Sequence, residues 1–319
     1  MATGILKLCT AALAGTLLGL SYERLGKDII SWPSFEVAHA ATPVIRDQRE
    51  INQRPAHHNR EPIKTDPILS AENFKHLAKY GFPSNDNIRI FDDFILSYDR
   101  RLRAAAWTFE HLTPAKLAPN SEVDRSKCDF QEDKTIHDFF RASSHDYRNS
   151  GYDRGHLAAA GNHKLRQSDV EQTFVLTNIS PQKPKFNREA WNKLEKYVRY
   201  RANRAKDLYV VTGPLYLPTK ESDGRMYVKY EVIGSNHVSV PTHFFKVFAY
   251  EMNEGSINLE AFLMPNDNSL NDKVNLADFR VPIDKIDSIE RAAGVIFFDR
   301  LPRKALQRDL PQIPSKDFA

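Results

Sequence analysis

A histidine, an arginine and an amide lie along one stretch of this chain with the chemistry needed to cut a phosphodiester bond. His156 follows Gly155, which is expected to form a tight turn that brings the backbone close to a ligand. With an ordinary pKa of about 6.5, the imidazole is largely neutral near pH 7 and can accept a proton from water. Arg154 offers a planar charged fork for a phosphate, and Asn187 offers a neutral oxygen of the kind that holds Mg²⁺ together with waters. These residues indicate a metal-dependent phosphodiesterase, specifically a nuclease.

Other polar residues could complete this site or merely surround it. Glu195 lies about 12 Å of helical rise beyond Asn187. Unless the helix start is distorted, we therefore expect Glu195 to hold waters around the metal or to order nearby arginines. Asn162 and His163 could line the site, but the pattern favours ordinary polar loop residues for both. Arg125 could point to the site or be solvated, and its spacing alone favours solvation.

The element that must carry Asn187 and Glu195 is a long amphipathic helix over 188–206, with Asn187 as its N-cap. Apolar residues recur along it at the spacing of one helix face. The other face is basic, because residues 183–206 hold nine lysines and arginines against two glutamates. A solvated helix face is usually mixed in sign, so this excess favours a phosphate-facing or steering surface.

Most other predicted elements are strands. Alternating or β-rich runs predict strands over 88–91, 93–98, 104–112, 171–179, 208–212, 226–233, 243–250, 257–264 and 294–298. Short helices are predicted over 73–78 and 283–293. A polar loop from 124 to 152 is long for a compact domain and is more often functional than filler. The mixture of elements indicates an α+β fold.

The totals are those of a globular protein without a disulfide framework. The 319 residues are 41% hydrophobic and 27% charged, which is ample for a sizeable core. A net charge of +4 is only mildly basic, so a site for a polyanion must come from local clustering. Of the two cysteines, only Cys128 lies in the globular part, where a small semi-buried residue is favoured over a reactive thiol.

The chain divides into four predicted segments. Residues 1–26 are a targeting or membrane-associated segment whose apolar run is shorter than the ~20 residues of a comfortable bilayer span. A secretory signal, a weak anchor and a hydrophobic mitochondrial presequence all stay open for it. Residues 27–66 are a flexible linker, in which His57 and His58 are linker residues rather than a metal site. The folded domain is predicted over 67–303, followed by a tail over 304–319.

Three motifs together resemble the DNA/RNA non-specific endonucleases, a family with the ββα-metal fold. Residues 153–163 read DRGHLAAAGNH, residues 173–182 read TFVLTNISPQ, and residues 186–195 read FNREAWNKLE. They resemble the signature of the family, the strand that follows it and the metal-binding helix. The resemblance covers roughly residues 71–301. It implies an antiparallel sheet flanked by helices, with the active-site histidine on a strand or loop and the metal-binding asparagine at the start of a long helix.

The resemblance also implies the chemistry of the site. His156 matches the general base of the family, Asn187 its direct metal ligand and Glu195 a catalytic acid outside the direct coordination of the metal. One Mg²⁺ ion would suffice, and Mn²⁺ could substitute for it. The implied activity is hydrolysis of both DNA and RNA, leaving 5′-phosphate and 3′-hydroxyl ends.

Further positions match supporting roles in the same family. Arg154 would contact the phosphate, and Arg125 would stabilise the transition state. Asp153 and Asn178 would form the scaffold of the site. The family also implies a homodimer. Its mitochondrial members are associated with the intermembrane space or inner membrane, and during cell death they move to the nucleus and fragment DNA.

Three other interpretations compete with this one. An exonuclease-like mitochondrial branch usually has serine at position 153 and a long C-terminal extension, so Asp153 favours the endonuclease branch. A nucleic-acid-binding scaffold without turnover would need none of His156, Asn187 and Glu195. A secreted scavenging nuclease is weakened by the lack of disulfide-capable cysteine pairs.

Overall fold

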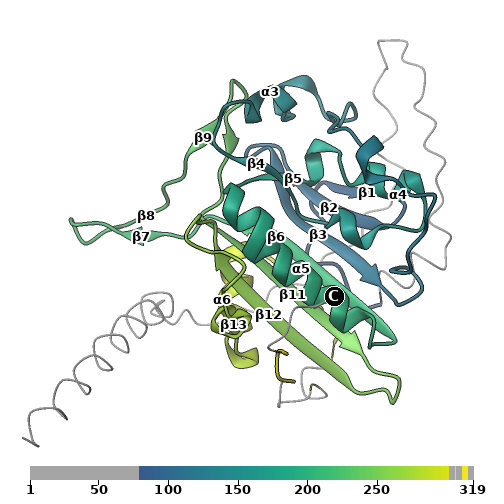
Figure 1. Ribbon diagram of the computed structural model, residues 1–319. Coiled ribbons are helices and arrows are strands. Elements are labelled where there is room, and N and C mark those ends of the chain that lie inside the picture. The colour runs from purple at the N-terminus through teal and green to yellow at the C-terminus, as the bar shows by residue number, and fades with distance from the viewer. Residues whose placement is uncertain (1–78, 302–305, 307–310, 315–319) are drawn as a thin grey trace, which may run out of the picture. The chain divides into compact units, whose positions relative to one another are not determined.

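The computed structural model describes residues 79–301, 306 and 311–314 (Figure 1). All of them belong to one compact unit, Asp66–Ala319. The predicted targeting segment 1–26, the linker 27–66 and the helix 73–78 lie outside the described residues, as does most of the tail. Within the described part, no helix is both long and apolar enough to cross a membrane.

A seven-stranded antiparallel sheet forms the centre of the fold, in the order β1-β2-β3-β6-β11-β12-β13. The predicted strands at 88–91, 93–98, 104–112, 208–212, 243–250 and 257–264 are confirmed as its members. Their bounds are β1 Ile88–Ile90, β2 Phe94–Asp99, β3 Ala104–Leu112, β6 Asp207–Leu215, β11 His243–Glu251, β12 Ile257–Pro265 and β13 Arg280–Val281.

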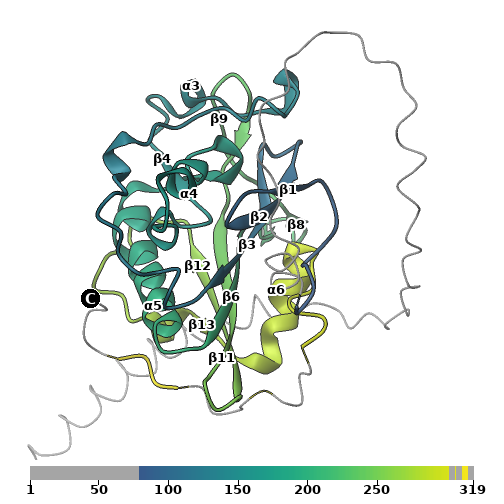
Figure 2. The same cartoon turned by 90° about the vertical axis from the view of Figure 1, so that its right-hand side faces the viewer.

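Each face of this sheet packs against a different helix. Alternate residues of a strand point to opposite faces: in β11, Phe244 and Phe248 join one apolar cluster, whereas Phe245 and Val247 join another. The first cluster packs against α5 (Asn192–Ala202), and the second packs against α6 (Ile286–Ala293). Figure 2 shows these two helices on opposite sides of the sheet.

The site is built on a small unit beside the first face. Strands β4 (Asp153–His156) and β5 (Ile179–Gln182) pair antiparallel, and the chain then enters the helical stretch that ends in α5. Two strands followed by a helix therefore hold the motifs of residues 153–163 and 186–195. This unit and the antiparallel sheet agree with the α+β fold that the sequence predicts.

The predicted strand over 171–179 is wrong. The chain there forms α4 (Gln167–Gln172) and a 3-10 turn (Leu176–Asn178), and strand β5 begins only at residue 179. The prediction relied on alternation, but five of the six residues over 173–178 are buried, so polar and apolar positions do not separate into two faces. Thr173 and Asn178 bond to backbone groups and Thr177 bonds to Asp133, so these buried polar side chains do not face solvent.

Two further strand predictions need correction. Residues 294–298 form no strand, because Gly294 ends α6 with a left-handed φ of 69° and the following segment packs Phe297 and Phe298 into the second apolar cluster. Residues 226–233 are strand only at their ends, in β8 (Met226–Tyr227) and β9 (Val232–Ile233). The predicted helix at 283–293 is confirmed as a 3-10 turn (Ile283–Lys285) followed by α6.

Short elements complete the described fold. They are 3-10 turns at Arg125–Lys127, Asp138–Phe140, Ala160–Asn162 and Leu276–Phe279, helix α3 (Ser144–Tyr147), and strands β7 (Thr219–Lys220) and β10 (Val238–Ser239). The first two turns and α3 lie in the loop over 124–152, which therefore has local structure of its own. β7 pairs with β8 in a hairpin that extends from the body of the fold (Figure 1).

Candidate active site

His156 ends strand β4 in an enclosed aromatic setting. Its side chain packs edge-on against Phe174, with ring centroids 4.6 Å apart, and lies 5.6 Å from the ring of Phe130. The residue is only 8% exposed, and among the described residues its Nε2 has no hydrogen-bond partner. Burial, helped by the positive charges of Arg125 and His163, lowers the pKa of His156 to about 3. The imidazole is therefore neutral at physiological pH, and the same burial and positive charges make it a weaker base than a free imidazole.

Gly155 does not form the predicted tight turn. It pairs with Ser180 in the β4–β5 ladder, and its φ is not in the left-handed region. A Cβ atom at this position would lie 2.2 Å from the side chain of Gln182. Glycine is needed because the Gln182 side chain crosses the strand next to His156.

Asn178 fixes the backbone that leaves His156. Its Oδ1 accepts a hydrogen bond from the Ala158 N–H at 2.9 Å, and its Nδ2 donates to the carbonyls of Ala158 and Thr173. The Leu157 N–H donates to the Asn178 carbonyl. A fully buried amide with these bonds holds β4 against the segment before β5, and this is a scaffolding geometry.

Asn187 lies close to β4 and is held by Asp153. Its Nδ2 donates to Asp153 Oδ2 at 3.0 Å, which turns the amide oxygen away from that carboxylate. Both oxygens of Asp153 also accept from Arg188, at 2.8 Å each. One half-buried carboxylate thus orients the amide and an exposed guanidinium on neighbouring residues.

The predicted N-cap role of Asn187 is wrong, because the helix begins before it. The Asn187 N–H already donates to the Lys183 carbonyl, and residues Phe186–Trp191 form a π-helix that runs directly into α5. Such wide turns occur often at functional sites. The predicted straight helix over 188–206 is therefore distorted at its start and ends at Ala202.

This distortion changes how Asn187 and Glu195 relate. In a regular α-helix, eight residues turn through about 800°, which leaves the two side chains about 80° apart. A π-turn advances only about 80° per residue, so four π steps and four α steps sum to about 720°, two full turns. Asn187 and Glu195 consequently share one face of the helix.

Glu195 is a half-buried carboxyl among cations. Burial raises its pKa, while the nearby charges of Lys246, Arg199 and Arg125 act in the opposite direction. Lys246 itself is buried, with its Nζ 2.6 Å from Thr212 Oγ1 and 4.9 Å from the Trp191 ring centroid. Burial therefore favours the protonated form of Glu195, and its lysine and arginine neighbours favour the charged form.

Arg125 and Arg154 lie on either side of the aromatic residues that enclose His156. The guanidinium of Arg125 lies 5.7 Å from the centroid of Phe174, and that of Arg154 lies 4.2 Å from the centroid of Phe130. Both side chains are exposed. Aromatic faces hold cations in this way, so both charges are kept near the imidazole, and among the described residues neither forms an ion pair with an acidic side chain.

A cleft of about 470 Å³ opens beside these residues. Asn187, Asp153 and Arg154 line it, together with Arg148 and Arg188. Of the predicted site residues, the structure thus brings Asp153, Arg154 and Asn187 to one cavity. His156 adjoins it through Phe130, which lines the cleft and contacts the imidazole.

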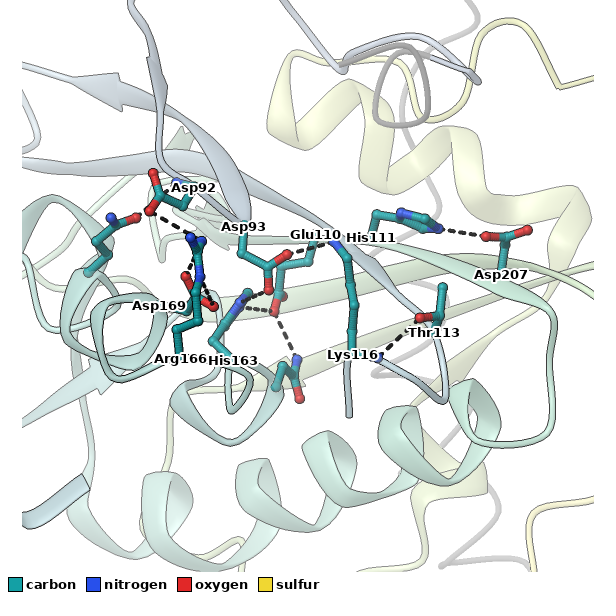
Figure 3. A network of polar contacts seen from close by, with 12 residues as sticks. Asp92, Asp93, Glu110, His111, Thr113, Lys116, His163, Arg166, Asp169 and Asp207 are labelled. Atoms are coloured by element: carbon teal, nitrogen blue, oxygen red, sulfur yellow. Dashed lines mark hydrogen bonds and ion pairs between the residues drawn. The ribbon is translucent and has the colours of Figure 1, made fainter. Parts of the chain in front are cut away.

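A buried ionic cluster behind the site was missed by the sequence analysis. His163 donates from both ring nitrogens, to Asp93 at 2.8 Å and to Glu110 at 3.0 Å (Figure 3). Glu110 also accepts from Asn162 Nδ2 at 2.8 Å, and Asn162 Oδ1 accepts from Arg199 at 3.1 Å. This chain of contacts connects the sheet to α5, the helix that carries Glu195.

The interpretation of Asn162 and His163 as polar loop residues is therefore wrong. They are 2% and 1% exposed, and the carboxylates that bind them come from β3 and the residue before β2. Burial alone would lower the pKa of His163, but the hydrogen bonds to Asp93 and Glu110 raise it to about 9. The only local signal was that Asn162 and His163 follow the DRGH motif.

The basic face of α5 is partly neutralised. Arg188 pairs with Asp153, Arg201 pairs with the buried Glu260, and Lys206 pairs with Glu251. Lys183 lies over the ring of Tyr152 at 4.1 Å. The nine basic residues therefore do not form one continuous phosphate-facing surface, and the one of them that lines the cleft, Arg188, is paired with Asp153.

The site offers one neutral oxygen ligand rather than a cage. Among the described residues, no group of three or more His, Cys, Asp and Glu side chains could hold a metal ion. The oriented amide of Asn187 fits a hard cation that keeps most of its waters, as Mg²⁺ does. It does not fit zinc, which takes four nitrogen, sulfur or carboxylate ligands.

Comparisons with known proteins agree with one another. The model of the family described as DNA/RNA non-specific endonuclease matches residues 73–304. The chain is 43% identical over 305 residues to the mitochondrial endonuclease G of Caenorhabditis elegans, covering 94% of both chains. It is 47% identical over 229 residues to the mitochondrial endonuclease G of Homo sapiens, covering 72% of this chain and 75% of the relative. A chain in the crystal structure of the EndoG/EndoGI complex is similar with a TM-score of 0.71 and 50% identity, covering 77% of this chain and 98% of that one.

Proposed function

This chain belongs to the DNA/RNA non-specific endonuclease family, and we propose that it is a Mg²⁺-dependent endonuclease in which His156 is the general base. The β4–β5 pair and the helix behind it form the ββα unit expected for the family. The observation that carries the proposal is the neutral imidazole of His156, held beside a cleft that contains the oriented amide of Asn187. The substrates are DNA and RNA.

The mechanism assigns one task to each residue. His156 takes a proton from the attacking water, and its buried setting keeps it unprotonated beforehand. Asn187 would hold the divalent cation, which would supply charge neutralisation at the phosphate and assistance to the leaving oxygen. Arg154 binds the phosphate, and Arg125 stabilises the extra negative charge of the transition state. Cleavage leaves 5′-phosphate and 3′-hydroxyl ends.

The scaffold residues act through these groups. Asp153 orients Asn187 through the 3.0 Å hydrogen bond, and Asn178 fixes the backbone after His156. Glu195 shares the helix face of Asn187 and orders waters near the cation. The positions of these residues support the assignment, while their roles stay predictions.

The location of the protein and its assembly complete the proposal. Proteins named mitochondrial endonuclease G match most of this chain, and on that basis the protein is mitochondrial. We propose the intermembrane space or inner membrane, with passage to the nucleus and DNA fragmentation in cell death. A reporter fused to residues 1–26 tests the targeting, since secretion into the medium would contradict it. We propose a homodimer, which light scattering on the purified protein tests.

One gel tests the catalytic proposal. Supercoiled plasmid is incubated with the full chain, with Mg²⁺ or EDTA, beside the His156→Ala variant. Nicking that needs Mg²⁺ and is lost in His156→Ala supports the nuclease and its base together. If the wild type binds the plasmid but never nicks it, the protein is a binding scaffold. Replacing Mg²⁺ by Mn²⁺, Ca²⁺ or Zn²⁺ in the same assay tests the choice of metal.

A further inference from the structure

The cleft beside Asn187 contains more positive charge than the reaction itself uses. Three of its lining residues, Arg148, Arg154 and Arg188, are arginines, and Asp153 is the acidic residue among them. Arg188 binds both oxygens of Asp153 at 2.8 Å, so that pair is internally neutral. Two guanidinium charges therefore remain, in a cavity whose volume of about 470 Å³ is within the range of ligand sites.

The two remaining arginines are held differently. Arg154 lies over Phe130 at 4.2 Å, with a 3.4 Å hydrogen bond to Ser144 Oγ, and is thus fixed close to His156. The guanidinium of Arg148 is exposed and, within residues 79–301, forms no hydrogen bond or ion pair. The mechanism assigns the scissile phosphate to Arg154 and leaves Arg148 without a task.

Arg148 nevertheless projects from a fixed turn. It directly follows α3, where the Ser143 N–H donates to Asp146 Oδ2 at 2.7 Å in a capping box. The same Asp146 accepts from the backbone and the side chain of Asn236, at 3.0 and 2.9 Å. A charge displayed from an anchored turn loses little backbone entropy when it binds a ligand.

We propose that Arg148 binds the backbone phosphate next to the scissile one, so that the cleft is a subsite for the neighbouring nucleotide. The inference rests on the proposed nuclease activity and adds to it a second phosphate contact. A nucleic-acid strand presents phosphates at regular short intervals, so a strand whose scissile phosphate lies at Arg154 must place another phosphate nearby. An unpaired guanidinium in the same cavity is suited to take it.

The experiment removes one charge at a time from the protein and from the substrate. The substrates are labelled tetranucleotides with a cleavable central phosphodiester. Each flanking linkage is a phosphorothioate, which is charged and resists cleavage, or a methylphosphonate, which is neutral. The full-length wild type is compared with Arg148→Ala, Arg148→Lys and Arg291→Ala. Arg291 is the control, because it is an exposed arginine on α6, across the sheet from the cleft.

We expect Arg148→Ala to lower kcat/KM about ten-fold on the fully charged substrate, mainly through KM, since hydrogen bonds to charged groups are worth about this much. Neutralising one particular flanking linkage should cost the wild type a similar factor. The same change should cost Arg148→Ala almost nothing, because the contact is already absent. Arg148→Lys should lie in between, and Arg291→Ala should match the wild type.

Two outcomes overturn the inference while leaving the nuclease intact. In the first, Arg148→Ala cleaves the charged substrate as well as Arg291→Ala does. In the second, each neutral linkage lowers kcat/KM by the same factor in Arg148→Ala as in the wild type. If the wild type cleaves nothing with Mg²⁺, the proposed function fails instead. Fluorescence anisotropy of the same oligonucleotides then still tests the contact, since Arg148→Ala should weaken binding of the charged form and flatten its salt dependence, and equal binding by both proteins would overturn it.

Discussion

The two faces of the central sheet differ in how much charge they bury. The face under α6 is built mainly from aromatic and aliphatic side chains such as Phe109, Val211 and Phe245. The face under α5 contains a second apolar cluster, but between its members it buries Glu110, Lys246 and other charged groups. Charge is costly to bury. On the α6 side the buried His111 pairs with Asp207, but the larger share of the buried charge lies on the face that carries the site, which indicates that the α6 side contributes stability and the α5 side contributes stability and chemistry.

Removing the base should have the largest effect on the α5 side. His156→Ala should reduce Mg²⁺-dependent plasmid nicking by about 10³-fold, because general base catalysis contributes about 10²–10⁴-fold. Urea denaturation measures separately the packing that the imidazole loses against Phe174 and Phe130, so the nicking rate is compared for the folded fraction of each protein. If His156→Ala retains more than a tenth of the rate, another group accepts the proton.

Breaking the ionic cluster should cost stability on the same side. His163→Leu leaves the carboxylates of Asp93 and Glu110 without their shared cation, and we expect the free energy of unfolding to fall by about 3–5 kcal/mol. Asn162→Ala, at the edge of the cluster, is a milder comparison. A loss below 1 kcal/mol for His163→Leu in urea denaturation would show that the cluster does not stabilise the fold.

A cavity on the α6 side should affect stability alone. Ile289 is 1% exposed in the second apolar cluster, so Ile289→Ala should lower the free energy of unfolding by about 2–4 kcal/mol. The specific nicking rate of the folded fraction, assayed well below the melting temperature, should stay within two-fold of the wild type. A large drop in that rate would contradict the conclusion that the α6 side contributes to stability and not to catalysis.

The pH dependence of stability should differ between wild type and His163→Leu. The pKa of His163 is raised to about 9 in the folded protein from about 6.5 when unfolded, so the folded state holds its proton more tightly. The stabilisation is fully present below pH 6.5 and is lost as pH rises through 9, with a slope of at most about 1.4 kcal/mol per pH unit. Urea denaturation between pH 6.5 and 9 should show this loss in the wild type and a flatter profile in His163→Leu. If the unfolding free energies of the two proteins changed with pH in parallel, His163 would not be the group responsible for the pH dependence.

The sequence predicted those parts of the fold that are long, rich in β-branched and aromatic residues and bounded by turn residues. The long central strands are buried on both faces and meet these conditions, and their bounds were predicted to within a few residues. Residues 173–178 failed because a short buried run does not by itself distinguish a strand from a packed turn. The residues of the DRGH motif and Asn187 could be identified from their types together with the resemblance of their motifs to the family.

Long-range contacts could not be predicted in this way. Asp93, Glu110 and His163 meet only because the fold brings β2, β3 and the turn after β4 together, and nothing in their sequence spacing indicates a shared proton site. Arg148 is similar: that its guanidinium has no partner among the described residues becomes visible only once the cleft is known. The role of a charged side chain depends on the residues it contacts, and these are often distant in the chain.

The π-helix at Phe186–Trp191 accommodates one residue more than a regular helix would need to keep Asn187 and Glu195 on one face. Deleting one residue between them would let the helix close into a regular α-helix, in which seven residues turn through about 700°, so the two side chains would stay within about 20° of one another. Deleting a second residue leaves about 600° and would turn them about 120° apart. During evolution, the loss of a single residue from this stretch should therefore preserve the alignment, whereas the loss of two should not.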